Sequence, residues 1–160
     1  MKLTLLAVGR MKNGPEKTLF ERYFERANAV GKPLGLHPVA CHEIAESKAA
    51  RANERMVQES GELLKIIDEK AVVIALDERG RSLASPAFAA LIGKIRDDGA
   101  RESVFLIGGA DGLDPELRAR ADHIISFGAL TWPHQIVRIL ISEQIYRAMS
   151  ILAGHPYHKQ

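Results

Sequence analysis

Short apolar runs alternate along this chain with longer segments in which apolar residues recur at helical spacing. The runs predict buried strands at 2–8, 34–44, 71–77, 104–107 and 123–127, with a turn at 78–80. The spacing predicts helices after Gly14-Pro15, across 47–69, after Ser85-Pro86, after Asp114-Pro115 and across 134–153. Because strands that alternate with helices form parallel sheets with right-handed crossovers, we expect an α/β fold with a mostly parallel sheet flanked by helices.

The composition fits one compact domain. The chain has 160 residues, the length of an ordinary domain, and no linker or repeat divides it, so residues 1–160 are predicted to form a single domain. Hydrophobic residues make up 46% and charged residues 26%, which excludes a disordered chain. The net charge of +2 is too small to indicate nucleic-acid binding by itself.

Three predicted strands end in unusual, glycine-containing segments, at 76–80, 107–112 and 127–133. In open α/β sheets the ligand crevice lies beyond the carboxyl ends of the strands, so these segments predict a ligand site. The chain contains neither G-x-G-x-x-G nor a P-loop, which argues against a dinucleotide or Walker-type site. Two alternatives remain: 107–112 is merely a tight turn, or the uncharged 127–132 segment only packs under the last helix.

The C-terminal quarter differs chemically from the rest of the chain. The predicted last helix is apolar on more than one side, and we expect its second side to pack on another copy, giving a homodimer. It also holds Glu143 and Arg147, four residues apart, and Arg138 as a candidate phosphate contact. The end of the chain, 155–159, combines histidines, a tyrosine and a lysine, which suit stacking on a base and meeting phosphate, unless it is simply a frayed terminus.

The cysteine count and the lengths of the apolar stretches limit the cellular compartments in which this chain is expected. Cys41 is the only cysteine, which excludes an internal disulfide and a zinc site of several thiolates. The H-x-x-H spacing of His155 and His158 has no third ligand nearby, so we expect no metal. No stretch approaches the roughly 20 apolar residues of a membrane span, and the first apolar run is shorter than a signal-peptide core. We therefore expect a cytoplasmic protein without membrane association.

Several motifs together resemble a known family. The segments LDERG, LIGGADGL, SFGALTWPHQIVRILISEQIYRA and HPYHK are similar to those of the RlmH family of the SPOUT superfamily of RNA methyltransferases. The similarity extends from MKLTLLAVG to the end of the chain. It implies a single-domain SPOUT fold whose C-terminal part forms a trefoil knot, and a homodimer.

The resemblance also implies an activity, namely methyl transfer from S-adenosyl-L-methionine to N3 of a pseudouridine in helix 69 of 23S rRNA within the assembled ribosome. The implied cofactor-binding residues are Leu76, Gly108, Phe127, Gly128, Ala129, Leu130, Thr131 and Trp132. The candidate catalytic residues are Glu143, Arg147, Tyr157 and His158, and the candidate RNA-binding residues are Arg138, Arg147, His155 and Lys159. The alternative is a non-catalytic, ribosome-associated RNA-binding factor on a methyltransferase-like fold.

One position departs from the family pattern. Family members commonly end in HPYHR, whereas this chain has Lys159 at the last position of the motif. Lysine keeps the positive charge but lacks the planar fork that binds phosphate in a bidentate way. We therefore expect the RNA contact at this position to be retained with a different geometry.

Overall fold

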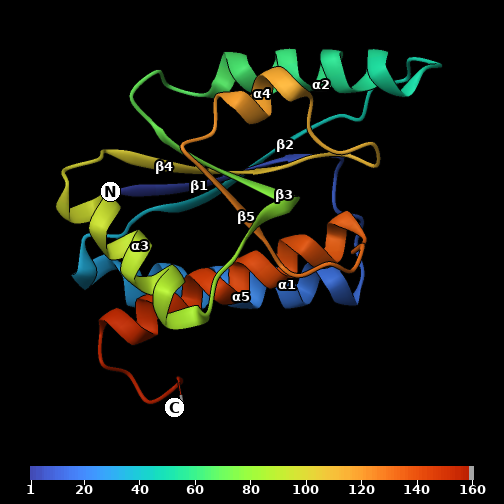
Figure 1. The fold of residues 1–160 in the computed structure, drawn as a ribbon. Coiled ribbons are helices and arrows are strands. Elements are labelled where there is room, and N and C mark those ends of the chain that lie inside the picture. Colours follow the sequence, from blue (N-terminus) through green and yellow to red (C-terminus); the bar gives the residue numbers. More distant parts are fainter. Residues whose placement is uncertain (159–160) are drawn as a thin grey trace.

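A computed structural model describes residues 1–158, which form a five-stranded parallel sheet with helices on both faces (Figure 1). The strand order is β2-β1-β4-β3-β5, and every neighbouring pair is parallel. The strands are β1 (Lys2–Val8), β2 (Val39–Ile44), β3 (Val72–Ser82), β4 (Glu102–Ile107) and β5 (His123–Ser126). The helices are α1 (Pro15–Gly31), the 3-10 helix η1 (Lys32–Leu34), α2 (Ala52–Ile66), α3 (Ser85–Asp97), α4 (Pro115–Ala119) and α5 (His134–Leu152).

The sheet separates two apolar layers. Helices α1, α3 and α5 cover one face and α2 and α4 cover the other (Figure 1). Strand β1 shows why both faces need cover: Leu3 and Leu5 join the core with α1, α3 and α5, whereas Leu6 and Val8 join the core with α2 and α4. A strand buried on both sides is a continuous apolar run, as the sequence of β1 predicted.

The predicted α/β architecture is confirmed, but three element boundaries are corrected. Strand β2 begins at Val39 rather than 34, because 32–34 form η1 and Gly35 turns the chain in a left-handed conformation. Helix α2 begins at Ala52 rather than 47, so 45–51 is an irregular segment. Ser85 is already inside α3 and its hydroxyl donates to Gln144, so it does not cap the helix. Asp114, by contrast, caps α4 by accepting from the backbone N–H of Glu116 at 2.8 Å.

The expected turn at 78–80 is wrong, because β3 continues through Ser82 and pairs with β5 again after a register shift. Gly80 permits this path. A Cβ atom at this position would lie 2.6 Å from the carbonyl carbon of Ile125, so the two backbones pass closer than any side chain allows. The trefoil knot that the family resemblance implies stays a prediction.

Helix α5 is enclosed mainly within the protomer. It lies beside α1 and α3 in one layer on the sheet (Figure 1), and Ile141, Ile145 and Met149 are almost fully buried. The premise that the sheet alone covers α5, leaving its second side for another copy, is therefore corrected. None of the helices of residues 1–158 is both long and apolar enough to cross a membrane.

Candidate functional site

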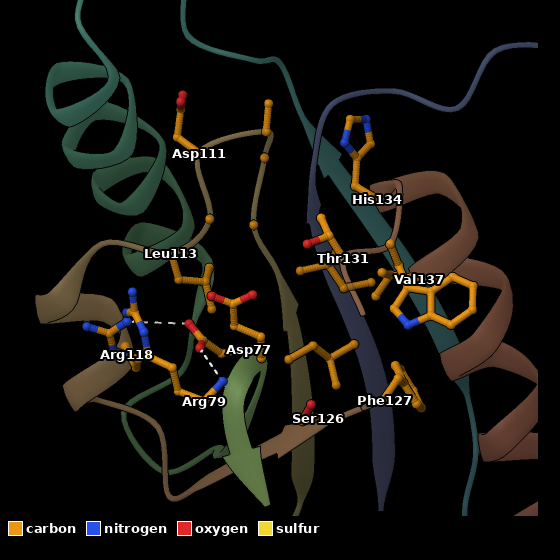
Figure 2. A pocket seen from close by; sticks show the side chains of 18 of the residues that line it. Asp77, Arg79, Asp111, Leu113, Arg118, Ser126, Phe127, Thr131, His134 and Val137 are labelled. Carbon is orange, nitrogen blue, oxygen red and sulfur yellow. Dashed lines mark hydrogen bonds and ion pairs between the residues drawn. The ribbon is translucent and has the colours of Figure 1, made fainter. Parts of the chain in front are cut away.

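A cleft of about 480 Å³ opens at the carboxyl edge of the sheet, between the middle of β3, where its pairing with β4 stops, the ends of β4 and β5 and the start of α5 (Figure 2). Its volume falls within the roughly 300–1,000 Å³ typical of small-molecule sites. Figure 2 shows Phe127, Thr131 and Val137 along one wall and the charged side chains of Asp77 and Arg118 along the opposite wall. The cleft thus combines an apolar wall with a charged one.

The three strand ends singled out in the sequence meet in this cleft. Seven of the eight predicted cofactor-binding residues line it, and Ala129 alone does not, although it belongs to the same loop. The seven are Leu76, Gly108, Phe127, Gly128, Leu130, Thr131 and Trp132. Parallel strands bring their carboxyl ends to one edge, which explains why segments far apart in the sequence converge.

The conformation of the loop 127–133 exposes its backbone polar groups to the cleft. Gly128 has φ +108°, a conformation that side-chain-bearing residues rarely adopt. The Ser126 hydroxyl fixes this turn, since it accepts from the N–H of Gly128 at 3.1 Å and donates to its carbonyl at 2.9 Å. Leu130 and Trp132 remain 71% and 40% exposed, which is unusual for large apolar side chains. The loop therefore offers backbone polar groups and apolar surface without any charge.

The opposite wall carries an ion pair that the sequence analysis missed. Asp77 accepts from the Arg118 guanidinium at 3.4 Å and from the backbone N–H of Arg79 at 2.9 Å. Arg118 comes from α4, 41 residues further along the chain, so no local pattern links it to Asp77. The pair fixes a carboxylate beside the cleft, just after the part of β3 that pairs with β4.

A second ion pair ties the glycine loop to α2. Arg55 donates from Nε to Asp111 at 2.7 Å and from Nη2 at 3.0 Å, a bidentate pair. The same guanidinium donates to the carbonyls of Ala49 and Ala50 in the irregular segment. The hydrogen bonds from Arg55 hold the pKa of the Asp111 carboxyl below its usual value. Arg55 thus anchors two segments at once, one of which lines the cleft.

The structure brings three of the four candidate catalytic residues together as a tail cluster, which we define as Glu143, Arg147 and Tyr157. The Tyr157 hydroxyl donates to Glu143 Oε1 at 2.9 Å, and Arg147 Nε donates to the same oxygen at 2.9 Å. The Arg147 guanidinium carbon lies 4.8 Å from the centre of the Tyr157 ring. Burial, followed by the hydrogen bond to Glu143, raises the pKa of Tyr157 well above its usual value. Tyr157 is therefore a neutral hydroxyl at physiological pH.

The tail cluster is centred on the middle and second half of α5, whereas the cleft lies at the start of the helix. His134 and Val137, at the start of the helix, line the cleft, whereas Tyr157 follows the helix and its hydroxyl reaches back to Glu143. With 19 residues, α5 is about 28 Å long. His158 is half-buried beside Tyr157, and His155 is exposed and accepts from the backbone N–H of Tyr157 at 3.2 Å. Lys159 lies outside the described residues.

Arg138 is separated from the other candidate RNA-binding residues. Its side chain is fully buried, with Nη1 donating to Glu43 at 2.6 Å and Nη2 donating to the carbonyls of Val8 and Gly9 at 2.6 Å each. A direct phosphate contact does not fit this burial. Within residues 1–158, no group of three or more His, Cys, Asp or Glu side chains is placed to hold a metal ion.

An open parallel sheet whose carboxyl edge holds a ligand-sized cleft, in a chain without a P-loop motif, is the architecture of an α/β protein with a small-molecule site. A family model described as "Predicted SPOUT methyltransferase" matches residues 1–158. The chain belongs to this SPOUT methyltransferase family, as its motifs suggested.

The relatives agree with this assignment, and two solved structures share the fold. Two proteins named "Ribosomal RNA large subunit methyltransferase H" are 51% identical, in Bradyrhizobium diazoefficiens, and 54% identical, in Brucella anthropi, each covering 99% of both chains. The crystal structure of a probable methyltransferase from Bordetella pertussis has a TM-score of 0.53 at 14% identity, covering 92% of this chain and 95% of that one. A probable methylase family protein from Haemophilus influenzae also has a TM-score of 0.53, at 12% identity, covering 99% and 70%. At this identity the two structures support the fold alone.

Proposed function

We propose that this chain is an S-adenosylmethionine-dependent methyltransferase of large-subunit ribosomal RNA, acting as a homodimer on N3 of a pseudouridine in helix 69 of the assembled ribosome. The carrying observation is the cleft, lined by seven of the eight residues expected to hold the cofactor. The names of the relatives, which match over nearly the whole chain, support a ribosomal RNA substrate.

The residues of the cleft fit the cofactor. The uncharged loop 127–132 offers backbone groups and apolar walls suited to an adenine ring, and Gly128 keeps the backbone open at the turn. At Gly108, a Cβ atom would lie 2.6 Å from the carbonyl carbon of Gly112, so only glycine lets the loop close upon itself. When bound, S-adenosylmethionine supplies an electrophilic methyl group. The loops themselves provide proximity and orientation.

The tail cluster suits the deprotonation that methylation at N3 requires. The N3–H of the base is weakly acidic, so a cation that stabilises the developing negative charge helps its loss. Arg147 is that cation, held by Glu143. Tyr157, whose raised pKa keeps the hydroxyl protonated further into the alkaline range, donates a hydrogen bond to Glu143 and does not act as the base. His158, next to it, is our candidate for the proton acceptor.

A homodimer joins the two halves of this site. Glu143 and Arg147 lie about 9 and 15 Å along the axis of α5 from Val137 in the cleft, so the tail cluster of a second copy is the one that completes each cleft in this proposal. Two α5 helices packed antiparallel about a two-fold axis bring the tail cluster of one copy to the cleft of the other. Ile136, Leu140 and Ile151 are only half-buried and share one helical face with Arg147, which supplies an apolar surface for this packing.

The decisive experiment is transfer of a labelled methyl group from S-adenosylmethionine to assembled ribosomes and, separately, to naked ribosomal RNA. We expect label only with ribosomes, and mass spectrometry of the digested RNA locates it on one pseudouridine. Calorimetry of cofactor binding runs in parallel. A chain without affinity for S-adenosylmethionine is instead the non-catalytic ribosome-associated factor, and label on another nucleotide contradicts the proposed target.

Replacing Arg55 with alanine is expected to weaken cofactor binding roughly tenfold, which corresponds to the net value of a charge-assisted hydrogen bond. The reason is that Arg55 holds Asp111 and, through it, the glycine loop that lines the cleft. Calorimetric titration with S-adenosylmethionine measures the effect. Arg51→Ala is the matched control, since Arg51 precedes the same helix and its side chain is 84% exposed. Equal affinities of the two variants contradict the anchoring role.

A further inference from the structure

A second hollow, of about 360 Å³, lies at the same edge of the sheet, where β1 and β2 end and α1 begins. Arg10, Lys17 and His42 line it, together with Glu21 and Glu43. None of the candidate catalytic or cofactor-binding residues takes part. Since all five strands are parallel, this hollow and the cofactor cleft share the carboxyl edge of one sheet.

The hollow and the cleft are neighbours, because two contacts connect them. His134, which lines the cleft, has its Nε2 atom 3.8 Å from Glu46 Oε1. A Cβ atom on Gly9 would lie 2.7 Å from that same oxygen, so the chain just before Arg10 packs against Glu46. A strand of substrate whose base enters the cleft therefore has the hollow within reach of its adjoining nucleotides.

The charge of the hollow favours an anion. The carboxylate of Glu43 is already neutralised, since it accepts from Arg138 at 2.6 Å and from the N–H of Met11 at 2.9 Å. Lys17 and Glu21 are 3.9 Å apart and offset each other. Arg10 and Lys12 are exposed and form no ion pair within residues 1–158. Arg10 lines the hollow and Lys12 lies two residues further along the same segment, so these two cations dominate the charge beside the hollow.

Hydrogen bonds to buried groups fix the backbone of the segment that carries these cations. The buried Arg138 donates to the carbonyls of Val8 and Gly9, and the N–H of Gly9 donates to Ile44 at 2.9 Å. Met11 is fixed by its bond to Glu43. A preorganised segment loses less entropy when it binds a ligand, so its cations contribute more to affinity. Arg138 thus acts as a positioning residue for Arg10, rather than as an RNA contact.

From these observations we infer that Arg10, Lys12 and the adjoining hollow bind the phosphates of the RNA strand next to the nucleotide that enters the cleft. The exposed imidazole of His42 adds a surface for base stacking. This inference rests on the proposed function for its choice of RNA, because a polyanion that is continuous with a base in the cleft must pass this edge. Phosphate contacts position the strand and carry no sequence preference.

The test compares two double variants that remove the same charge. Arg10→Ala with Lys12→Ala alters the hollow, whereas Lys70→Ala with Arg101→Ala removes two exposed cations at the opposite edge, before β3 and β4. For the first variant we expect the KM for ribosomes to rise roughly tenfold and the slope of log KM against log salt to fall by about 1 to 2, as for one or two lost phosphate contacts. The kcat and the affinity for S-adenosylmethionine stay unchanged. Equal KM values and slopes for both variants overturn the inference.

Binding of a fluorescent single-stranded oligoribonucleotide at low salt separates the remaining outcomes. We expect the first variant to bind it more weakly than the wild type and the control. If its KM for ribosomes rises while oligonucleotide affinity is unchanged, the surface contacts a ribosomal protein and the RNA assignment fails. If neither the wild type nor the control transfers methyl groups, the proposed function fails, whereas the dependence of oligonucleotide binding on Arg10 and Lys12 still decides the inference.

Discussion

Replacing Arg147 with alanine is expected to lower the rate of methyl transfer by about a hundredfold to a thousandfold, the cost of removing one preorganised group that stabilises a developing anion. Cofactor binding is expected to stay unchanged, because the loops that line the cleft hold the cofactor and Arg147 is not among their residues. Rate measurements at saturating ribosomes and calorimetry with S-adenosylmethionine check the two parts. Arg22→Ala, an exposed arginine on α1, is the control.

The conservative substitution Arg147→Lys separates charge from geometry. Lysine retains the positive charge but loses the fork that binds Glu143 through two nitrogens. We expect an intermediate rate for this variant. A full rate would show that only the charge matters and would leave the stacking of Arg147 on Tyr157 without a role in the reaction.

The shared site adds a stronger test of the same prediction. Gly128→Val distorts the cofactor loop, since valine disfavours φ near +108°, and we expect it to abolish methyl transfer by a different route. When Arg147→Ala and Gly128→Val chains are mixed and allowed to re-associate, each mixed dimer contains one intact composite site. Activity is expected to return to about a quarter of the wild-type level, given random pairing of the two chains. Mixing without recovery contradicts a site shared between protomers.

Sequence patterns predicted the cleft well because one rule of α/β architecture places it. Leu76 is the last residue of β3 that pairs with β4, and Gly108 and Phe127 directly follow β4 and β5, so parallel pairing carries all three to one edge. The ion pairs that stiffen the cleft were not predictable in this way. Arg55 and Asp111 are 56 residues apart, and their pairing depends on how α2 is laid over the sheet. Local periodicity contains no information on that placement.

Arg138 illustrates the same limit on the other side of the sheet. An arginine on a largely apolar helix, near an unusual C-terminal tail, resembles a phosphate contact when its partners are unknown. Its partner Glu43 lies 95 residues earlier, at the end of an edge strand, and the carbonyls that it binds end β1. The apolar neighbours of Arg138 in fact indicate a buried position, and a buried cation requires a paired anion. The chain contains that anion, but only the fold identifies it.

Replacing Arg138 with methionine is expected to lower the free energy of unfolding by about 3–5 kcal/mol, the usual cost of breaking a buried ion pair from one side. Methionine fills much of the space but leaves the Glu43 carboxylate and the carbonyls of Val8 and Gly9 without their donor. A domain is stable by only about 5–15 kcal/mol, so the loss is a large share of the total. Urea denaturation followed by circular dichroism measures it, with Arg101→Ala as an exposed control.

A double-mutant cycle of Arg138→Met, Glu43→Gln and the double variant then isolates the energy of the ion pair itself. Adding Glu43→Gln to Arg138→Met removes the stranded charge, so the double variant is expected to be more stable than Arg138→Met alone. Glu43→Gln also affects the segment that carries Arg10, because the Glu43 carboxylate accepts a hydrogen bond from the N–H of Met11. The free energy of unfolding of Arg138→Met could instead lie within about 1 kcal/mol of the wild-type value, as for the loss of an exposed arginine. That result would show that Arg138 is not the buried anchor of this edge. In that case its original interpretation as an RNA contact regains its basis.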